Sequence, residues 1–433
     1  MAIVPRDYQA EATEASVEYL LSRKMKGRNG VVVAPTGSGK SVVIAGIAMR
    51  LNEPVLVFQP SKEILIQNLG KLASYGYPAA VFSASLDRRE IGPITLATIG
   101  SVVANPEAFR RFKYVLIDEC HAAVNPKGGQ FDDFLAAIPQ ARVLGLTATP
   151  FRLASNSMGS ELRFLTRTVP RIFNDVVHQT PIRTLYEQGY LTPLDYRVDE
   201  VIRREKLKPN AKGSDYTDAS VQAEMFEVGF VGKLQAEVER AFAEGRKNVL
   251  TFTRFVDESR RLAAVVSGSG LVSADDDRNR DEVLRAFRRG ELRHVTNVGI
   301  VSIGFDFPAL ECVVLGRSTV SLAVYYQQVG RIVRPVYAGG YDLSTVDGRL
   351  AAIAAGPKPK AYVVDLVGSV KQFGRVEDLE LRPSGKHGRE WAIYSGSQQL
   401  TNRYFFGGDG FDPAVAAKAR KRRQFWAKRR ATT

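Results

Sequence analysis

The chain has 433 residues, a length that predicts two or three domains, each able to bury its own core. Apolar residues make up 45% and charged residues 24%, which excludes a disordered polymer and a membrane bundle, and two cysteines cannot supply a disulfide framework or a four-ligand zinc site. A net charge of +14 points to a polyanionic partner, either nucleic acid or anionic lipid. The polar N-terminus lacks the apolar segment of a secretory signal, so we expect a cytoplasmic protein with no membrane partner.

Short apolar runs recur along the chain, and each is followed by a polar loop and a helical pattern. The first series predicts strands at residues 31–33, 55–58, 114–117 and 143–146, and the second predicts strands at residues 249–252, 313–315 and 362–364. This succession is typical of parallel sheets with helices on both faces. The fold class is therefore expected to be α/β, with two domains in tandem.

The expected domain boundaries follow from where this pattern weakens. Apolar periodicity fades between Glu187 and Val231, and residues 206–214 have the composition of an exposed loop. We expect the last strand to end near Leu366 and a glycine-rich, irregular extension to follow it. The predicted organisation is a first domain at 1–190, a linker region at 191–230, a second domain at 231–370 and an extension at 371–433.

A glycine-rich loop lies between the first predicted strand and a helical pattern at residues 42–49, with the sequence Ala34-Pro-Thr-Gly-Ser-Gly-Lys-Ser41. In this order, backbone N–H groups converge on a phosphate at the positive end of a helix. Lys40 would place an ammonium on the β and γ oxygens of a nucleotide, and the Ser41 hydroxyl would ligate Mg²⁺. The predicted phosphate-binding residues are Thr36, Gly37, Ser38, Gly39, Lys40 and Ser41.

Two later strands end in polar residues at the same expected sheet edge. Tyr114-Val-Leu-Ile-Asp-Glu-Cys-His121 ends in two acids, where Asp118 is suited to hold Mg²⁺ and Glu119 to orient and deprotonate water. Alone, such acids can simply cap the next helix. Thr147 and Thr149 follow the next strand and would relay the phosphate state, although ordinary turn chemistry also explains them.

The order of these motifs resembles the superfamily 2 helicases of the DExH type, with Asp-Glu-Cys-His as the second motif, from about Arg6 to about Asp365. The resemblance implies two RecA-like domains and ATP with Mg²⁺ as cofactors. By that similarity Arg6 and Gln9 contact the adenine, and His121 couples the nucleotide to the strand-binding side. Ser61, Thr98 and Ser101 occupy places that contact nucleic-acid phosphates, although each also suits a helix N-cap.

The second domain resembles the family in its fifth and sixth motifs. Residues 296–308 contain Gly304 and Asp306 at the core of the fifth motif, and Asp306 would contact the ribose or position an arginine. Residues 325–334 fit Gln-x-x-Gly-Arg-x-x-Arg, with Gln327 at the nucleotide. On a helix, Arg331 and Arg334 would share one face and neutralise charge on the γ-phosphate.

The implied function is an ATP-driven helicase or translocase, acting as a monomer. The Asp-Glu-Cys-His form looks most like RadD-like and phage branch-migration helicases and restriction-enzyme motor subunits, although the chain lacks the cysteine-rich tail of RadD-like enzymes. DNA, as a single strand, a fork or a branched structure, is the expected partner, with RNA as the alternative. Two other readings stay open: a nucleotide-gated clamp or loader that does not unwind, and a motor that needs a nuclease partner.

The last 22 residues carry half of the net charge. Residues 412–433 hold eight basic residues and one acid, which leaves +7 for the other 411 residues. This tail would grip nucleic acid or dock on a protein partner, and a solvated end is the plain alternative.

Deletion of residues 412–433 is expected to weaken DNA binding and to flatten its salt dependence, because fewer counterions are released on binding. The measurement is the affinity for a DNA duplex at several salt concentrations. An unchanged slope would remove the tail from the binding surface.

Overall fold

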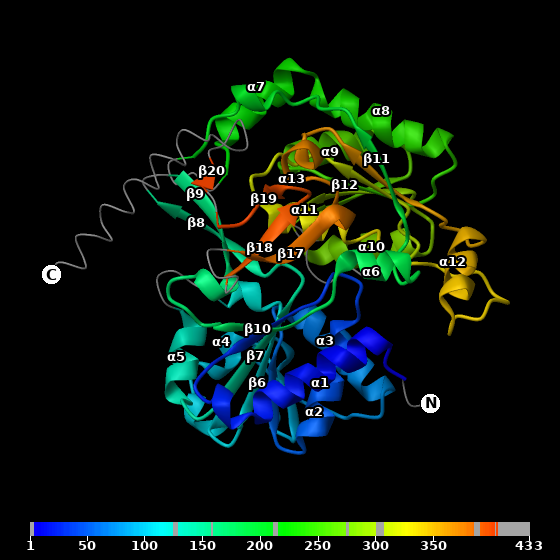
Figure 1. Cartoon of the computed structure of the whole chain (residues 1–433). Helices are drawn as coiled ribbons and strands as arrows, with labels where there is room; N and C mark the ends of the chain where they lie inside the picture. The colour runs from blue at the N-terminus through cyan, green and yellow to red at the C-terminus, as the bar shows by residue number, and fades with distance from the viewer. Residues whose placement is uncertain are drawn as a thin grey trace. The chain divides into compact units, whose positions relative to one another are not determined.

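The computed structural model describes residues 4–123, 129–156, 159–210, 215–273, 277–299, 307–384, 390–402 and 404–405. The chain forms two compact units, the first built mainly from residues 1–152 and the second mainly from residues 185–380. Each unit contains a large sheet, blue to teal in the first unit and green to orange in the second (Figure 1). Within the described ranges, no helix has the length and apolar character needed to cross a bilayer.

The sheet of the first unit has eight strands in the order β10-β1-β7-β6-β2-β5-β3-β4. Its strands are β1 (Gly30–Val33), β2 (Val55–Phe58), β3 (Ala80–Ser83), β4 (Arg88–Arg89), β5 (Ile94–Ala97), β6 (Tyr114–Asp118), β7 (Arg142–Thr147) and β10 (Asp175–Gln179). Every pairing is parallel except that of β3 with β4. The four strands expected here from apolar runs are confirmed, because those runs are buried on both faces.

Helices cover both faces of this sheet. They are α1 (Asp7–Leu21), α2 (Lys40–Leu51), α3 (Lys62–Ser74), α4 (Ile99–Val102) and α5 (Gln130–Ala137), with 3₁₀ turns η3 (Pro106–Phe109) and η4 (Cys120–Ala122). One core cluster joins α1, α2 and α3 to the sheet, and a second cluster on the other face joins η3, η4 and α5 to it. In the second cluster Phe134 meets Phe58 and Phe109 edge to face, with ring centroids 5.1 and 6.0 Å apart.

The sheet of the second unit has six parallel strands in the order β11-β16-β15-β12-β14-β13. They are β11 (Leu194–Val198), β12 (Val249–Phe252), β13 (Ser269–Ser273), β14 (His294–Val298), β15 (Cys312–Leu315) and β16 (Ala361–Asp365). The helices are α7 (Asp218–Glu227), α8 (Phe230–Ala243), α9 (Val256–Val265), α10 (Asp277–Arg288), α11 (Leu322–Val329) and α12 (Val346–Ala354). The three expected strands at 249–252, 313–315 and 362–364 are confirmed. The expected fold class is confirmed with them: two α/β domains, each built on a mainly parallel sheet.

The expectation that the chain becomes irregular after Leu366 is wrong. A helix, α13 (Ser369–Phe373), follows, and then a three-stranded sheet of β17 (Leu379–Ser384), β18 (Glu390–Ser395) and β19 (Gln398–Gln399). A separate sheet contains β8 (Phe151–Asn156), β9 (Gly159–Phe164) and β20 (Tyr404–Phe405). The basic tail at 412–433 lies outside the described residues.

A close approach of β7 to η4 requires a glycine. A Cβ on Gly145 would lie 2.5 Å from Cys120 Sγ and 2.7 Å from Phe173 Cε1. Cys120 is fully buried and belongs to the Asp-Glu-Cys-His motif. The absence of a side chain at this point of β7 therefore sets how closely the motif packs on the sheet.

Gly145→Ala is expected to lower the free energy of unfolding by about 1–3 kcal/mol, because the added methyl group overpacks this core. The measurement is the urea unfolding midpoint. Gly70→Ala is the matched control: Gly70 lies in α3 with open space around it, so the change is expected to stabilise by up to about 1 kcal/mol. Equal midpoints for the two variants would contradict the packing constraint.

Candidate functional site

The glycine-rich loop connects β1 to α2, and α2 begins at Lys40. Gly37 and Gly39 have φ angles of 84° and 79°, a left-handed conformation that favours glycine. A Cβ on Gly39 would lie 2.5 Å from the Gln9 amide nitrogen. The first N–H groups of α2 have no acceptor within the helix, so the loop and the start of α2 form a cradle that fits an anion such as a phosphate.

The N-terminal motif lies directly against this loop. Gln9 is buried, its amide nitrogen donates to the Ser38 carbonyl at 2.7 Å, and its carbonyl oxygen accepts from the Arg6 N–H at 3.0 Å. The Tyr8 hydroxyl donates to the same Ser38 carbonyl at 2.9 Å. The structure therefore joins Arg6 and Gln9 to the phosphate cradle, and their contact with adenine stays a prediction.

The two acids at the end of β6 meet the loop lysine. Lys40 Nζ lies 3.2 Å from Glu119 Oε1, and the Glu119 N–H donates to Asp118 Oδ1 at 3.0 Å. Glu119 has φ 48°, a left-handed backbone that non-glycine residues seldom adopt and that recurs at functional sites. Burial and the neighbouring Glu119 charge raise the pKa of Asp118. Burial acts to raise the pKa of Glu119 as well, but Lys40 and His121 outweigh it and lower that pKa, which keeps Glu119 ionised.

Asn68, on α3, links the two predicted magnesium ligands, although it belongs to none of the motifs recognised in the sequence. The Ser41 hydroxyl donates to Asn68 Oδ1 at 2.6 Å, while Asn68 Nδ2 donates to Asp118 Oδ2 at 3.2 Å and to Gln59 Oε1 at 2.8 Å. Asn68 is buried, at 6% exposure. Because Ser41 gives its proton to Asn68, its lone pairs are left for a cation, and a hydroxyl and a carboxylate that share one amide suit Mg²⁺.

His121 and the two threonines after β7 form one network with Glu119. His121 Nδ1 lies 2.9 Å from Thr147 Oγ1, 3.1 Å from Thr149 Oγ1 and 3.4 Å from Glu119 Oε2. Thr147 Oγ1 also donates to Glu119 Oε2 at 3.3 Å, and the Thr149 N–H donates to Thr147 Oγ1 at 3.0 Å. The three predicted coupling residues are thus brought together at the predicted base.

The three predicted phosphate-contacting hydroxyls have local partners. Ser61 is the N-cap of α3, and its hydroxyl accepts from the Ile64 N–H at 3.4 Å. Thr98 and Ser101 lie within hydrogen-bonding distance of each other at 2.8 Å, and Ser101 also accepts from the Ala84 N–H. Capping therefore explains the position of Ser61, and nucleic-acid contact by these residues stays a prediction.

The two arginines of the sixth motif do not share a helix, so that expectation is wrong. Gln327 lies in the last turn of α11, which ends at Val329; Arg331 follows in a turn, and Arg334 lies in a segment without regular secondary structure. Arg334 precedes a proline, which disfavours helix at that residue. Burial lowers the pKa of Arg334 to about 10, so it stays charged at neutral pH. Gly304 and Asp306 lie outside the described residues.

A buried lysine fixes the backbone of the arginine segment. Lys358 Nζ donates to the carbonyls of Ile332 at 3.1 Å and Leu310 at 3.2 Å, and also to the Pro308 carbonyl. Lys358 is 2% exposed. Burial lowers the pKa of Lys358 to about 7. Its amino group therefore holds the segment between Arg331 and Arg334 against the end of the fifth motif and the loop after it.

Comparisons with known proteins match both units. Residues 2–152 match the family "Type III restriction enzyme, res subunit" (ResIII), and residues 232–336 match "Helicase conserved C-terminal domain". The fold is similar to a fragment of a putative HsdR subunit of a type I restriction enzyme from Vibrio vulnificus, with TM-score 0.59 and 19% identity over 86% of this chain and 65% of that one.

Two curated relatives are similar over most of this chain. A 51.5 kDa protein of a Lactococcus phage is 26% identical over 70% of this chain and 62% of its own length. A putative DNA 3'-5' helicase Rad25 of Haloarcula marismortui is 24% identical over 76% of this chain and 50% of its own length. The chain therefore spans between half and two thirds of the length of these relatives. With a ResIII domain followed by a helicase C-terminal domain, the chain is a member of helicase superfamily 2.

Proposed function

We propose that the protein is an ATP-dependent helicase or translocase that acts on DNA. The observation that carries this proposal is the meeting of Lys40, Glu119, Ser41 and Asp118 at one sheet edge, within hydrogen-bonding or ion-pair distance of one another or of the shared Asn68. A phosphate cradle, two cation ligands and an ionised carboxylate are the parts needed to hydrolyse a nucleoside triphosphate.

The residues of the site divide this chemistry between them. The loop amides and Lys40 hold the phosphates, Ser41 and Asp118 hold Mg²⁺, and ATP supplies the bond to be cleaved. Glu119 orients and deprotonates the attacking water. Arg331 and Arg334, from the second domain, neutralise the charge that develops on the γ-phosphate. His121, Thr147 and Thr149 transmit to the end of β7 the change that hydrolysis causes at Glu119.

DNA is proposed as the substrate for two reasons. The similar Rad25 protein is named a DNA helicase, and a net charge of +14 suits a phosphate backbone. Within this proposal the chain works as a monomer on single-stranded, forked or branched DNA, in unwinding or branch migration. The basic tail would add to the grip on DNA or dock a protein partner.

Lys40→Ala is expected to lower ATP turnover by at least about a thousandfold, because it removes the cation that faces the β and γ oxygens. The measurement is phosphate release at saturating ATP and DNA. Lys24→Ala is the matched control, since Lys24 is an exposed lysine of the same unit. Full ATP turnover in the Lys40→Ala variant would contradict the assignment of this site.

A second experiment tests whether the protein acts on DNA or RNA and whether it unwinds the strands. ATP hydrolysis should rise with single-stranded or forked DNA more than with RNA of the same sequence, and a labelled strand should be displaced from a fork only with ATP. A protein that bound the fork but displaced nothing would be a clamp or loader. Stronger stimulation by RNA would overturn the choice of substrate.

Asn68 is proposed as a positioning residue for Mg²⁺, because it fixes the Ser41 proton and one oxygen of Asp118. Residues that orient metal ligands typically contribute 10- to 100-fold in metal affinity or activity.

Asn68→Ala is therefore expected to raise the Mg²⁺ concentration needed for half-maximal ATP hydrolysis by roughly 10- to 100-fold. Binding of a fluorescent ADP analogue without Mg²⁺ should stay unchanged, because the phosphate cradle is not altered. Ser74→Ala, on the exposed end of α3, is the control. A uniform loss of ADP binding with and without Mg²⁺ would show that Asn68 supports only the local fold.

A further inference from the structure

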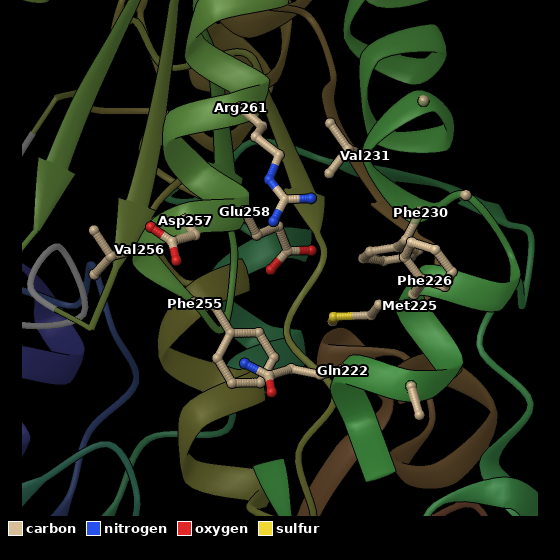
Figure 2. Close-up of a pocket in the computed structure, with 13 residues that line it drawn as sticks. Gln222, Met225, Phe226, Phe230, Val231, Phe255, Val256, Asp257, Glu258 and Arg261 are labelled. Carbon is tan, nitrogen blue, oxygen red and sulfur yellow. The ribbon is translucent and has the colours of Figure 1, made fainter. Parts of the chain in front are cut away.

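A cavity of about 800 Å³ lies in the second unit between α7, α8 and the start of α9 (Figure 2). Its walls are largely apolar and aromatic, and they include Met225, Phe226, Phe230 and Phe255. Phe226 is 87% exposed, the largest value among the exposed large apolar side chains of the described residues. A cavity of this volume matches those that bind small molecules, and it opens just beyond the carboxyl end of β12, the sheet edge where α/β folds place ligands.

A buried carboxyl group in this cavity has one unsatisfied oxygen. Glu258 is 7% exposed, and its Oε2 accepts from the Arg254 N–H at 3.2 Å, while Oε1 has no hydrogen-bond partner among the residues that the structure describes. Figure 2 shows the carboxyl group directed into the space that Met225 and Phe230 face. Burial raises the pKa of Glu258 to about 7. An unpaired buried acceptor is costly, so a ligand with an N–H group would be stabilised at this point.

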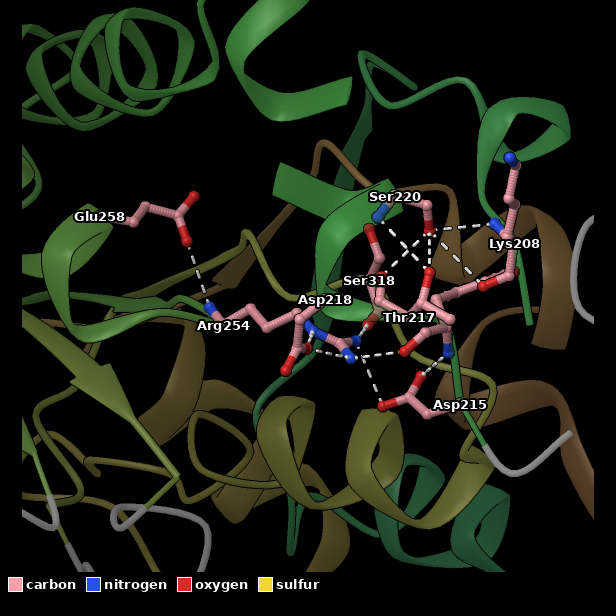
Figure 3. A network of polar contacts seen from close by, with 9 residues as sticks. Lys208, Asp215, Thr217, Asp218, Ser220, Arg254, Glu258 and Ser318 are labelled. Carbon is pink, nitrogen blue, oxygen red and sulfur yellow. Dashed lines mark hydrogen bonds and ion pairs between the residues drawn. The ribbon is translucent and has the colours of Figure 1, made fainter. Parts of the chain in front are cut away.

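The two sides of the cavity are tied together by Arg254, which is 9% exposed at its side chain (Figure 3). Its guanidinium donates to Asp218 at 2.9 Å, to Asp215 at 3.2 Å and to the Ser318 carbonyl at 3.2 Å. Asp218 begins α7, and Arg254 stands two residues before α9. This network joins the starts of both helices, so the cavity is organised before any ligand binds.

Arg261 gives the cavity a cationic side. It lines the same space, and Figure 2 shows its guanidinium pointing toward Glu258. An arginine at the rim suits a phosphate. Aromatic walls, a hydrogen-bond acceptor and a nearby guanidinium therefore correspond to the ring, the exocyclic amine and the phosphate of one nucleotide.

We propose that this cavity receives one unpaired nucleobase with an exocyclic amine, such as cytosine, from a single strand. The base lies against Phe226 and Phe255, its amine donates to Glu258 Oε1, and its phosphate lies near Arg261. Thymine presents the O4 acceptor where cytosine presents its N4 amine, so thymine meets the ionised Glu258 carboxylate unfavourably. The inference rests on the proposed action on nucleic acid and adds a base preference to it.

The test compares fluorescence anisotropy of labelled dC12 and dT12 with the full chain, without nucleotide. The protein should bind dC12 roughly five- to a hundredfold more tightly than dT12. Phe226→Ala should weaken dC12 binding about fivefold or more, because base stacking is lost. Tyr341→Ala is the matched control, an exposed aromatic residue of the same unit outside the cavity, and it should leave binding unchanged.

Glu258→Gln separates base recognition from general binding. Its amide can donate to thymine O4, so dT12 binding should rise and the preference for dC12 should disappear. The isosteric change keeps the shape of the side chain, and circular dichroism checks that the variant folds.

Equal binding of dC12 and dT12, with no effect of Phe226→Ala, would overturn the base pocket while DNA-stimulated ATP hydrolysis persisted. Absence of both DNA binding and stimulated hydrolysis would instead remove the proposed function. Free dCMP serves as the other source of the same base: Phe226-dependent binding of dCMP alone, with dC12 unaffected, would overturn the assignment to a strand. A basic peptide that bound through Glu258 in place of dC12 would overturn it as well.

Discussion

The candidate site depends on the parallel pairing of β1 with β7 and of β7 with β6. The register sets Val33 beside Thr147 and Asp118 beside Leu146, so the three strands end at one edge. The chain leaves each strand at that edge, and the glycine loop, the two acids and the threonines meet there although they are far apart in sequence. A slip of one residue in β6 would turn the Asp118 side chain to the opposite face of the sheet.

Charged side chains lie at this edge in a largely buried environment, and their pairing limits the free-energy cost of burying them. Lys40 and Glu119 form an ion pair, and His121 and Thr147 hold the second oxygen of Glu119. The left-handed backbone at Glu119 costs about 1–3 kcal/mol, and it is held by bonds on both sides, from its N–H to Asp118 and from the Ala122 N–H to its carbonyl. The strained position turns the Glu119 carboxylate toward the loop lysine.

The sequence was a good guide to the two sheets and to the residues at the strand ends, because buried parallel strands appear as continuous apolar runs. It missed Asn68, since a polar residue inside an amphipathic helix carries no local signal and its partners, Ser41 and Asp118, come from two other elements. Arg331 and Arg334 have a spacing typical of one helical face, but the helix ends at Val329, where a glycine precedes the arginines and a proline follows them. Glycine density likewise obscured β17 and β18, whose burial patterns show no regular alternation between the two faces of a strand.

Asp118 and Glu258 show how two equally buried carboxyl groups can serve different ends. Each is 7% exposed; Asp118 is the last residue of β6, and Glu258 lies in the first turn of α9, the helix that follows β12. Both oxygens of Asp118 accept hydrogen bonds, from the Glu119 N–H and from Asn68, so the protein itself fixes that carboxylate for a cation. Within the described part of the chain Glu258 is held by one oxygen only, and its other oxygen is buried at the wall of an apolar cavity. The hydrogen bonds to Asp118 preorganise it as a metal ligand. The unpaired oxygen of Glu258 costs free energy in the folded chain, so a ligand that donates a hydrogen bond to it would be stabilised.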